Sequence, residues 1–417
     1  MNQIASSRIG LYQVIFGWMN FVLVIPAIYL LLGLPLTMRE CGWSGTDIGF
    51  FQLAGLPAVF KFLLALPIQR FRVGKRHYSY WVVLLVLILV ALLYLISDPG
   101  MLARRIPLFL LALTISLLST WVDIPLNALA VKLLPRSEQM RAGTIRSMAT
   151  FVGAIVGSGF MLVLQGWWGW QAPFYIMSGS LLFGLLLMTR LREDEQGDEQ
   201  GDERGLQSTK PIMDLSGYFR QPGAKFWIWL LVSSFPFIGA VWLYLKPMLL
   251  DLGVVAQNVA WIVGVGGGSI GAISSLLSGP LVRYLGVTKA IPGYLFFALL
   301  ALVALTLSML FKLYIAWIIA SIFLVSIAMG GMSSLMFGLM MIFTRHKCRA
   351  SDYGFQTSIF VVARLTFPLG AGMILDTGGY VLMLTVLSLC VLSVFILTLI
   401  FRSHIAYIVL HEHDELA

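Results

Sequence analysis

Twelve apolar runs of about twenty residues follow one another along the chain, and a helix of that length crosses the hydrocarbon core of a bilayer. Within a bilayer every backbone N–H and C=O must bond inside the protein, so such runs form α-helices. The predicted segments are residues 11–35, 46–69, 78–97, 106–131, 144–166, 171–190, 224–248, 258–282, 288–310, 314–341, 353–375 and 380–401. The sequence therefore predicts an all-α membrane protein with twelve transmembrane helices.

Charge is scarce and unevenly placed. Only 11% of the residues are charged, against about 25% in an average soluble protein, which leaves no room for a large soluble domain. With the N-terminus inside, two of the 28 Lys and Arg residues fall within the membrane and five outside. The other 21 face the inside, so both termini are expected in the cytoplasm. The positive charge thus reflects orientation in a lipid bilayer, and no nucleic-acid partner is expected.

The chain divides into two similar halves. Residues 191–222 are polar, repetitive and acidic, which indicates a cytoplasmic linker between residues 1–190 and 223–417. Landmarks recur between the halves at offsets of 211 to 213 residues: Pro35 with Pro247, Gly42 with Gly253, Asp47 with Asn258, Pro67 with Pro280, and Arg70 with Arg283. This duplication predicts two six-helix halves, as in the major facilitator fold, around a site near the bilayer midplane.

Four polar side chains are expected in one layer near that midplane. Lys61 and Asp123 each lie nine residues, or about 13 Å, from the inner ends of their segments at Arg70 and Lys132. Arg364 lies about 18 Å deep, and Asn20 at a similar depth. Because ionisable groups at this depth are costly, we interpret them as functional residues.

The types of these residues suggest roles. Asp123 is expected to pair with Lys61, with Asn127 one helical turn away, which leaves Arg364 for an anionic group. Tyr353 and Thr357 lie on the Arg364 side of their segment, and an aromatic wall is expected from Trp121. These features favour a substrate of moderate size that is anionic or polar and aromatic.

A purely structural alternative stays open at this point. Lys61 and Asp123 can simply hold two helices together, and Arg364 can bond to backbone carbonyls. Asn20 and Asn127 suit either substrate contact or helix packing. The five histidines are all predicted at the cytoplasmic face, so no metal site or histidine-based membrane enzyme is expected.

Two stretches resemble AmpG-like permeases. The first is Leu56-Pro-x-x-x-Lys61-Phe-Leu-x-Ala65 followed by Arg70; the second runs from Asp123-Ile-Pro-Leu-Asn127 to Arg141-Ala-Gly-Thr-Ile-Arg146 and the glycines of segment 5. Within that group the chain is most similar to the RhtX/FptX branch of siderophore-uptake permeases, including those of pyochelin- and yersiniabactin-type loci. Asn127 stands where the group usually has a second acid, and Gln69 where it usually has Asp.

The resemblance implies a bacterial inner-membrane transporter that imports a ferric siderophore or related metallophore with proton coupling. We expect Asp123 to be the coupling acid and Arg70 and Arg283 to act at the inner gate. The protein is expected to work as a monomer, driven by the proton motive force, without a resident cofactor or catalytic residue.

Rival functions are a muropeptide permease of the AmpG type, for which fourteen segments are common, and a membrane signalling component that binds a siderophore without moving it. A membrane acyl-transfer enzyme would need a histidine or nucleophile cluster in the core, which the sequence does not contain.

Overall fold

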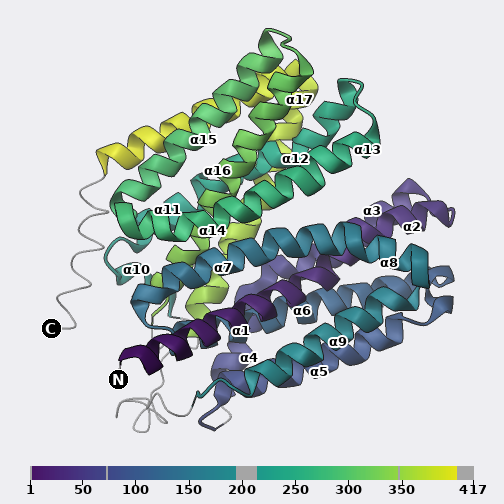
Figure 1. Ribbon diagram of the computed structural model, residues 1–417, viewed down its shortest axis with the longest axis vertical. Coiled ribbons are helices and arrows are strands. Elements are labelled where there is room, and N and C mark those ends of the chain that lie inside the picture. The colour runs from purple at the N-terminus through teal and green to yellow at the C-terminus, as the bar shows by residue number, and fades with distance from the viewer. Residues whose placement is uncertain (1, 72–73, 194–213, 346–347, 402–417) are drawn as a thin grey trace. The chain divides into compact units, whose positions relative to one another are not determined.

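The computed structural model describes residues 2–71, 74–193, 214–345 and 348–401, which form helices without a strand in those ranges (Figure 1). The α-helices are α1 (Asn2–Ile28), α2 (Leu34–Glu40), α3 (Gly45–Phe51), α4 (Lys61–Arg70), α5 (His77–Ile96), α6 (Arg105–Leu133), α7 (Arg136–Ile155), α8 (Met161–Trp168), α9 (Gln171–Met188), α10 (Leu215–Arg220), α11 (Ala224–Ser233), α12 (Phe235–Asp251), α13 (Ala256–Val259), α14 (Gly268–Leu285), α15 (Val287–Leu310), α16 (Ile315–Ile342) and α17 (Arg349–Ile400). Most of the predicted acidic linker, residues 194–213, lies outside the described residues.

The prediction of an all-α fold with twelve spans is confirmed. In the described residues, eleven helical stretches are long and apolar enough to cross a membrane, and α17 is the last of them. This helix contains two helices that meet at Gly379, whose φ of 72° is accessible to glycine at little cost. Counted as two spans, α17 completes the predicted set.

Several spans depart locally from α-helical geometry. The second span consists of α3, the 3₁₀-helical η2 (Gln52–Phe60) and α4. Pro57 lies within η2 and lacks the N–H that a regular α-helix needs there. The other such stretches are the π-helical η1 (Tyr29–Gly33), η4 (Val156–Phe160) and η6 (Ala260–Gly267). The short 3₁₀-helical η3 (Pro99–Ala103) lies between two spans. As a result, Lys61 is the first residue of a new α-helix rather than the middle of a continuous one.

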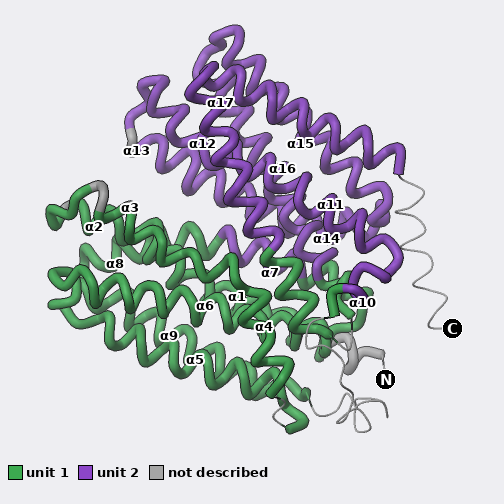
Figure 2. The backbone as a smooth tube through the Cα atoms, turned by 180° about the vertical axis from the view of Figure 1, so that it is seen from behind, with its two compact units in different colours: residues 1–142, 152–215, 341–358 green, residues 143–151, 216–340, 359–417 purple. Residues whose placement is uncertain are grey.

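The described chain forms two compact units that exchange short pieces (Figure 2). Unit 1 contains residues 1–142, 152–215 and 341–358, and unit 2 contains residues 143–151, 216–340 and 359–417. The middle of α7 therefore belongs to unit 2, and the start of α17 belongs to unit 1. The predicted boundaries of the two halves remain predictions.

Unit 1 is built on a core between α1, α5, α6 and α9, whose apolar faces pack together. The glycines near the end of α7 and in η4 pack against α1. A Cβ on Gly153 would meet Val24 at 3.0 Å, and one on Gly157 would meet the carbonyl oxygen of Ile25 at 3.0 Å. Glycine at these positions lets the two backbones approach closely.

Unit 2 is built from α10 to α16, the later part of α17 and the middle of α7. Its glycine-rich stretch 264–271 is helical, with η6 leading directly into α14. A Cβ on Gly271 would meet the ring of Phe151 at 2.8 Å. Gly267, where a Cβ would meet the Trp242 ring at 2.7 Å, and Gly271 therefore serve close helix packing within the unit.

Candidate functional site

Lys61 and Asp123 form an ion pair inside unit 1. The Lys61 Nζ lies 2.7 Å from Asp123 Oδ2, and the two side chains are 12% and 15% exposed. Both residues lie within candidate membrane spans, on α4 and α6. The predicted pairing is therefore present, in surroundings where a charge without a partner would be costly.

Asn127 holds the other side of the same carboxylate. Its Nδ2 donates to Asp123 Oδ1 at 2.9 Å and to the Asp123 backbone carbonyl at 2.7 Å. Asn127 is fully buried, so it braces the carboxylate rather than facing an open space. The two carboxylate oxygens thus have separate partners, a cation and an amide.

An apolar wall surrounds the pair. The indole ring of Trp121 lies 6.0 Å from that of Trp81, centroid to centroid, next to the small cluster of Ala65, Ile68, Ile124, Ala128 and Ala350. In the described part of the chain, the buried Trp121 Nε1–H has no hydrogen-bond partner. Pro125, four residues on, also cannot donate to the Trp121 carbonyl. The role of Trp121 as an aromatic wall of the site remains a prediction.

The start of α17 closes over this region of unit 1. The Phe62 N–H, in the first turn of α4 where intrahelical partners are missing, donates to Ser358 Oγ at 2.9 Å. A Cβ on Gly354 would lie 3.2 Å from the Lys61 carbonyl oxygen. Tyr353 and Thr357 are buried beside it, and Thr357 Oγ1 donates to the Tyr353 carbonyl at 2.8 Å. Both residues are therefore packed in the structure, not open to solvent.

Arg364 lies in unit 2, so its predicted convergence with Lys61 and Asp123 remains a prediction. It is fifteen residues from both Arg349 and Gly379, about 22 Å from either end of that helix. Its side chain is exposed, and no hydrogen bond or ion pair of the guanidinium is found among the described residues. An arginine at this depth normally faces protein or a water-filled cavity.

The exposed apolar side chains of this helix point elsewhere. They lie between about 100° and 180° around the helix from Arg364, and they are Val362, Leu365, Leu369 and Met373. Pro368 lies on the same side of the helix as Arg364. Because proline has no backbone N–H, the Arg364 carbonyl lacks its usual helical donor. Tyr244 Oη donates to the Pro368 carbonyl at 2.9 Å. Arg364 therefore lies on the side of the helix away from its exposed apolar residues.

The remaining predicted residues lie at helix ends or within a helix. Arg70 ends α4 and Arg283 lies in the last turn of α14, and both are exposed, at equivalent positions of the repeat. Asn20 is buried, and its Nδ2 donates to the Phe16 carbonyl of its own helix at 2.8 Å. Its amide nitrogen therefore bonds within α1 rather than to a second helix.

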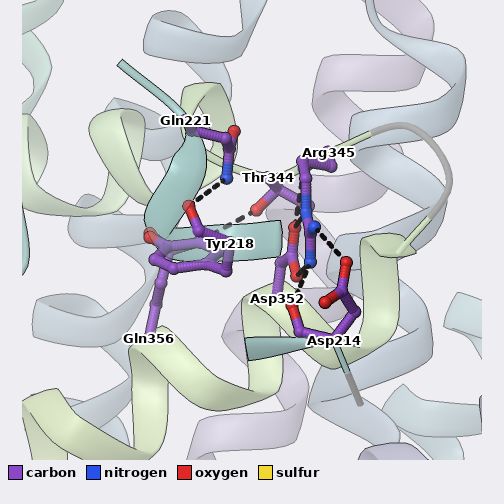
Figure 3. Close-up of polar contacts among 7 residues, drawn as sticks. All are labelled: Asp214, Tyr218, Gln221, Thr344, Arg345, Asp352 and Gln356. Carbon is purple, nitrogen blue, oxygen red and sulfur yellow. Dashed lines mark hydrogen bonds and ion pairs between the residues drawn. The ribbon is translucent and has the colours of Figure 1, made fainter. Parts of the chain in front are cut away.

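One polar network was missed by sequence reasoning (Figure 3). Arg345 Nε lies 2.7 Å from Asp352 Oδ2, and Arg345 Nη1 lies 3.1 Å from Asp214 Oδ2. The hydrogen bond that Arg345 donates to Asp352 raises the pKa of the Arg345 guanidinium above its usual range. Asp352 is 2% exposed. The available signal was an acid in the first turn of a helix, seven residues after an arginine.

A second missed residue is Arg146 in the unit 2 part of α7. It is 7% exposed, and its guanidinium carbon lies 4.5 Å from the centre of the Phe337 ring. This geometry is that of a cation–π contact. The available signal was an arginine inside the predicted apolar segment 144–166.

Comparisons with known proteins find similarity to one family of membrane proteins. A model of the Major Facilitator Superfamily matches residues 11–368. The anhydromuropeptide permease of Escherichia coli (strain K12) is 29% identical over 164 residues, which is 36% of this chain and 33% of that permease. The match thus spans about a third of the length of that relative.

Solved structures agree in architecture. A bacterial homologue of the iron transporter ferroportin, in an outward-facing state, has a TM-score of 0.68 and 16% identity, over 94% of this chain and 98% of that one. The E. coli fucose:proton symporter has a TM-score of 0.68 and 14% identity, over 94% and 99%. At these identities the likeness concerns the fold alone.

Proposed function

The chain belongs to the Major Facilitator Superfamily, a family of transporters rather than enzymes, and we propose that it imports an anionic metal–siderophore complex across the bacterial inner membrane into the cytoplasm. The observation that carries the proposal is Arg364, an exposed arginine midway along a membrane span without a polar partner among the described residues. A guanidinium offers a planar, two-pronged donor that suits a carboxylate or phenolate.

The Lys61–Asp123 pair supplies the coupling in this proposal. Protonation of Asp123 would cancel one charge of the pair and free Lys61 for a second anionic group of the substrate. Asn127 would keep the carboxyl group in place during this exchange, because it donates to both the side chain and the backbone of Asp123. Proton entry and substrate binding would then be linked through one carboxyl group.

Orientation and gating complete the proposal. The excess of Lys and Arg on one side supports cytoplasmic termini. Arg70 and Arg283, at the ends of α4 and α14 on that side, would act at the inner gate. The cargo itself rests on the resemblance of the Lys61 and Asp123 motifs to siderophore-uptake permeases.

A muropeptide is the second candidate cargo, favoured by the 29% identity to an anhydromuropeptide permease. Muropeptides also carry carboxylates, so Arg364 suits them as well. The two cargoes differ in what travels: one brings a metal and an aromatic chelator, the other a sugar–peptide. A signalling component that binds a siderophore without moving it is the remaining alternative.

The test is uptake into right-side-out vesicles that contain the protein, under an imposed proton gradient. The probes are an iron-labelled complex of an aromatic, anionic siderophore and a labelled anhydromuropeptide. We expect the wild type to accumulate the iron complex. Arg364→Ala should transport it at least about tenfold more slowly, because that factor corresponds to the loss of one hydrogen bond to a charged group. Arg364→Lys should fall between them.

Thr366→Ala is the matched control, because its hydroxyl bonds within its own helix, to the Val362 carbonyl at 2.9 Å. It should transport as the wild type does. Accumulation of the muropeptide but not the iron complex would replace the proposed cargo. Equal uptake by Arg364→Ala would remove Arg364 from the site, and binding of the iron complex without accumulation would favour signalling.

A further inference from the structure

The face of α6 that carries Asp123 is polar over three turns of the helix. At about 100° per residue, the polar residues lie within about 60° of Asp123 around the helix axis, and they are Ser116, Ser119, Thr120 and Asn127. All of them belong to unit 1. We call Ser116, Ser119 and Thr120 the hydroxyl strip.

The hydroxyl groups of this strip lack hydrogen-bond partners among the residues that the structure describes. No hydrogen bond of these three side chains is found there, and Ser119 Oγ is fully buried. A serine or threonine inside a helix commonly donates to the carbonyl four residues back. Thr114 of the same helix does so, to the Leu110 carbonyl at 2.7 Å. The strip therefore keeps its hydrogen-bonding capacity for another molecule.

The burial of the strip limits the size of that molecule. Ser116, Ser119 and Thr120 are 4%, 6% and 9% exposed, whereas Arg364, the proposed substrate contact, is exposed. A buried hydroxyl without a partner is costly, and ordered water is the usual partner of such groups. Water therefore fits the strip better than a substrate of moderate size does.

The polar face reaches Asp123 from one side only. In the proposed orientation α6 runs from the outer to the inner side, so Ser116 lies about 10 Å outward of Asp123 at 1.5 Å per residue. On the inner side the polar face ends at Asn127, whose buried Oδ1 has no partner in the described ranges. Farther inward on this face, Ala130 and Leu134 are apolar and buried. The strip thus connects Asp123 toward the outer side.

The irregular part of the second span runs beside this half of α6. The 3₁₀-helical η2 packs against α6 and leads directly into Lys61, the partner of Asp123. Pro57 within η2 has no N–H, so one carbonyl of this stretch lacks its helical donor. An ordered water needs two to four polar partners. Water between η2 and α6 would find both hydroxyl and carbonyl groups.

We propose that the hydroxyl strip holds a short file of ordered water molecules that carries protons from the outer side to Asp123. This inference rests on the proposed proton coupling and adds the route. Each water accepts one proton and releases another, the hydroxyls keep the waters in line, and the Asp123 carboxylate gains the last proton. The waters and hydroxyls end neutral, and Asp123 becomes a carboxylic acid, which cancels its charge beside Lys61.

The first test follows the protonation of Asp123 in the reconstituted full-length protein, by infrared difference spectroscopy after a drop in external pH. Loss of the carboxyl band in Asp123→Asn assigns the band. We expect Ser119→Ala and Thr120→Val each to slow the appearance of the band about tenfold, the effect of one lost hydrogen bond in the file. Thr120→Ser, which keeps the hydroxyl, should retain most of the rate.

Thr114→Val is the matched control, because the Thr114 hydroxyl is on the same helix but exposed and bonded to its own backbone. It should show the wild-type rate. Since the strip hydroxyls have no partner in the described protein, Ser119→Ala and Thr120→Val should unfold at or above the wild-type temperature. A lower unfolding temperature with an unchanged protonation rate would show a packing role and overturn the proposal.

Uptake of the iron complex at different external pH values distinguishes a proton route from a substrate contact. Ser119→Ala should lower the maximal rate at neutral pH, recover toward the wild type in acid, and leave the KM for the complex unchanged. A raised KM at every pH, uptake driven by a sodium gradient in place of the proton gradient, or a wild type without an Asp123 band would contradict the route. If the wild type takes up no iron complex but the band still depends on the strip, the proposed cargo fails and the route stands.

Discussion

Two helix crossings bring together segments that are far apart in the sequence, and the two crossings are made by different kinds of contact. In unit 1 the start of α17 packs on α4, beside the Lys61–Asp123 ion pair. In unit 2 the middle of α7 meets α14 and α16 through hydroxyl groups and glycines, and Arg146 adds a cation–π contact with Phe337 of α16. Ser147 Oγ lies 2.8 Å from both Ser275 Oγ and Ser333 Oγ.

Backbones also approach much more closely in unit 2. A Cβ on Gly143 would collide with the backbone of Gly338, and a Cβ on Gly330 would collide with that of Gly271. Contacts between serines and glycines can hold helices together in a membrane without an ion pair. Since the molecule can pack helices in this way, packing alone does not require the ion pair in unit 1. The proposed functional role of the pair accounts for the cost of placing two charges there.

The largest expected effect comes from breaking the ion pair on one side. Asp123→Asn leaves the Lys61 ammonium without the carboxylate it contacts. We expect the free energy of unfolding to fall by an amount near the lower end of about 3–5 kcal/mol, because the pair is partly exposed. The double variant Lys61→Met/Asp123→Leu should regain most of this stability. Thermal unfolding in detergent measures both.

Transport assays distinguish a functional role of the ion pair from a purely structural one. Both variants should lose gradient-driven uptake, although the double variant is stable. If the double variant transports at the wild-type rate, the pair is only a structural link. If it stays as unstable as Asp123→Asn, the pair is needed for packing and the contrast between the two crossings fails.

The next effect concerns the close approach in unit 2. Gly143→Ala places a methyl group against the Gly338 backbone, which cannot rotate away as a side chain can. We expect the free energy of unfolding to fall by about 1–3 kcal/mol, the usual range for overpacking. A lower unfolding temperature measures this effect. Gly159→Ala, where a Cβ meets nothing within 4 Å, is the control and should be neutral or slightly stabilising. Equal losses in both variants would show a general effect of replacing glycine.

The fold and the ion pair could be predicted from the sequence for physical reasons. Long apolar runs have few alternatives in a membrane, so hydropathy locates the spans. Charged residues deep in such runs are few, and opposite charges at equal depth have strong reason to pair. The same reasoning found Lys61 and Asp123, although not the 3₁₀ stretch that makes Lys61 the start of α4.

The crossing in unit 2 could not be predicted in this way. Serine and glycine are frequent in membrane helices and leave no distinctive spacing, and the partners of Ser147 lie 128 and 186 residues away. Asn20 illustrates the same limit, since its amide was free to bond to its own helix or to another one. Its choice depends on packing that the sequence alone does not specify.

The smallest expected effect asks whether the hydroxyl groups or the close approach hold the unit 2 crossing. Ser147→Ala removes two buried hydrogen bonds, and at about 0.6 kcal/mol each in a membrane the loss should be about 1 kcal/mol. Ser158→Ala is the control, because its hydroxyl donates to the Ala154 carbonyl of the same helix at 2.7 Å. It should leave the unfolding temperature unchanged. If Ser147→Ala costs as much as Gly143→Ala, hydrogen bonding contributes as much as close packing, and this crossing is a polar contact like that in unit 1. If it costs about 1 kcal/mol or less, close packing between glycines is the main source of stability at this crossing, in contrast to the ion pair beside the crossing of unit 1.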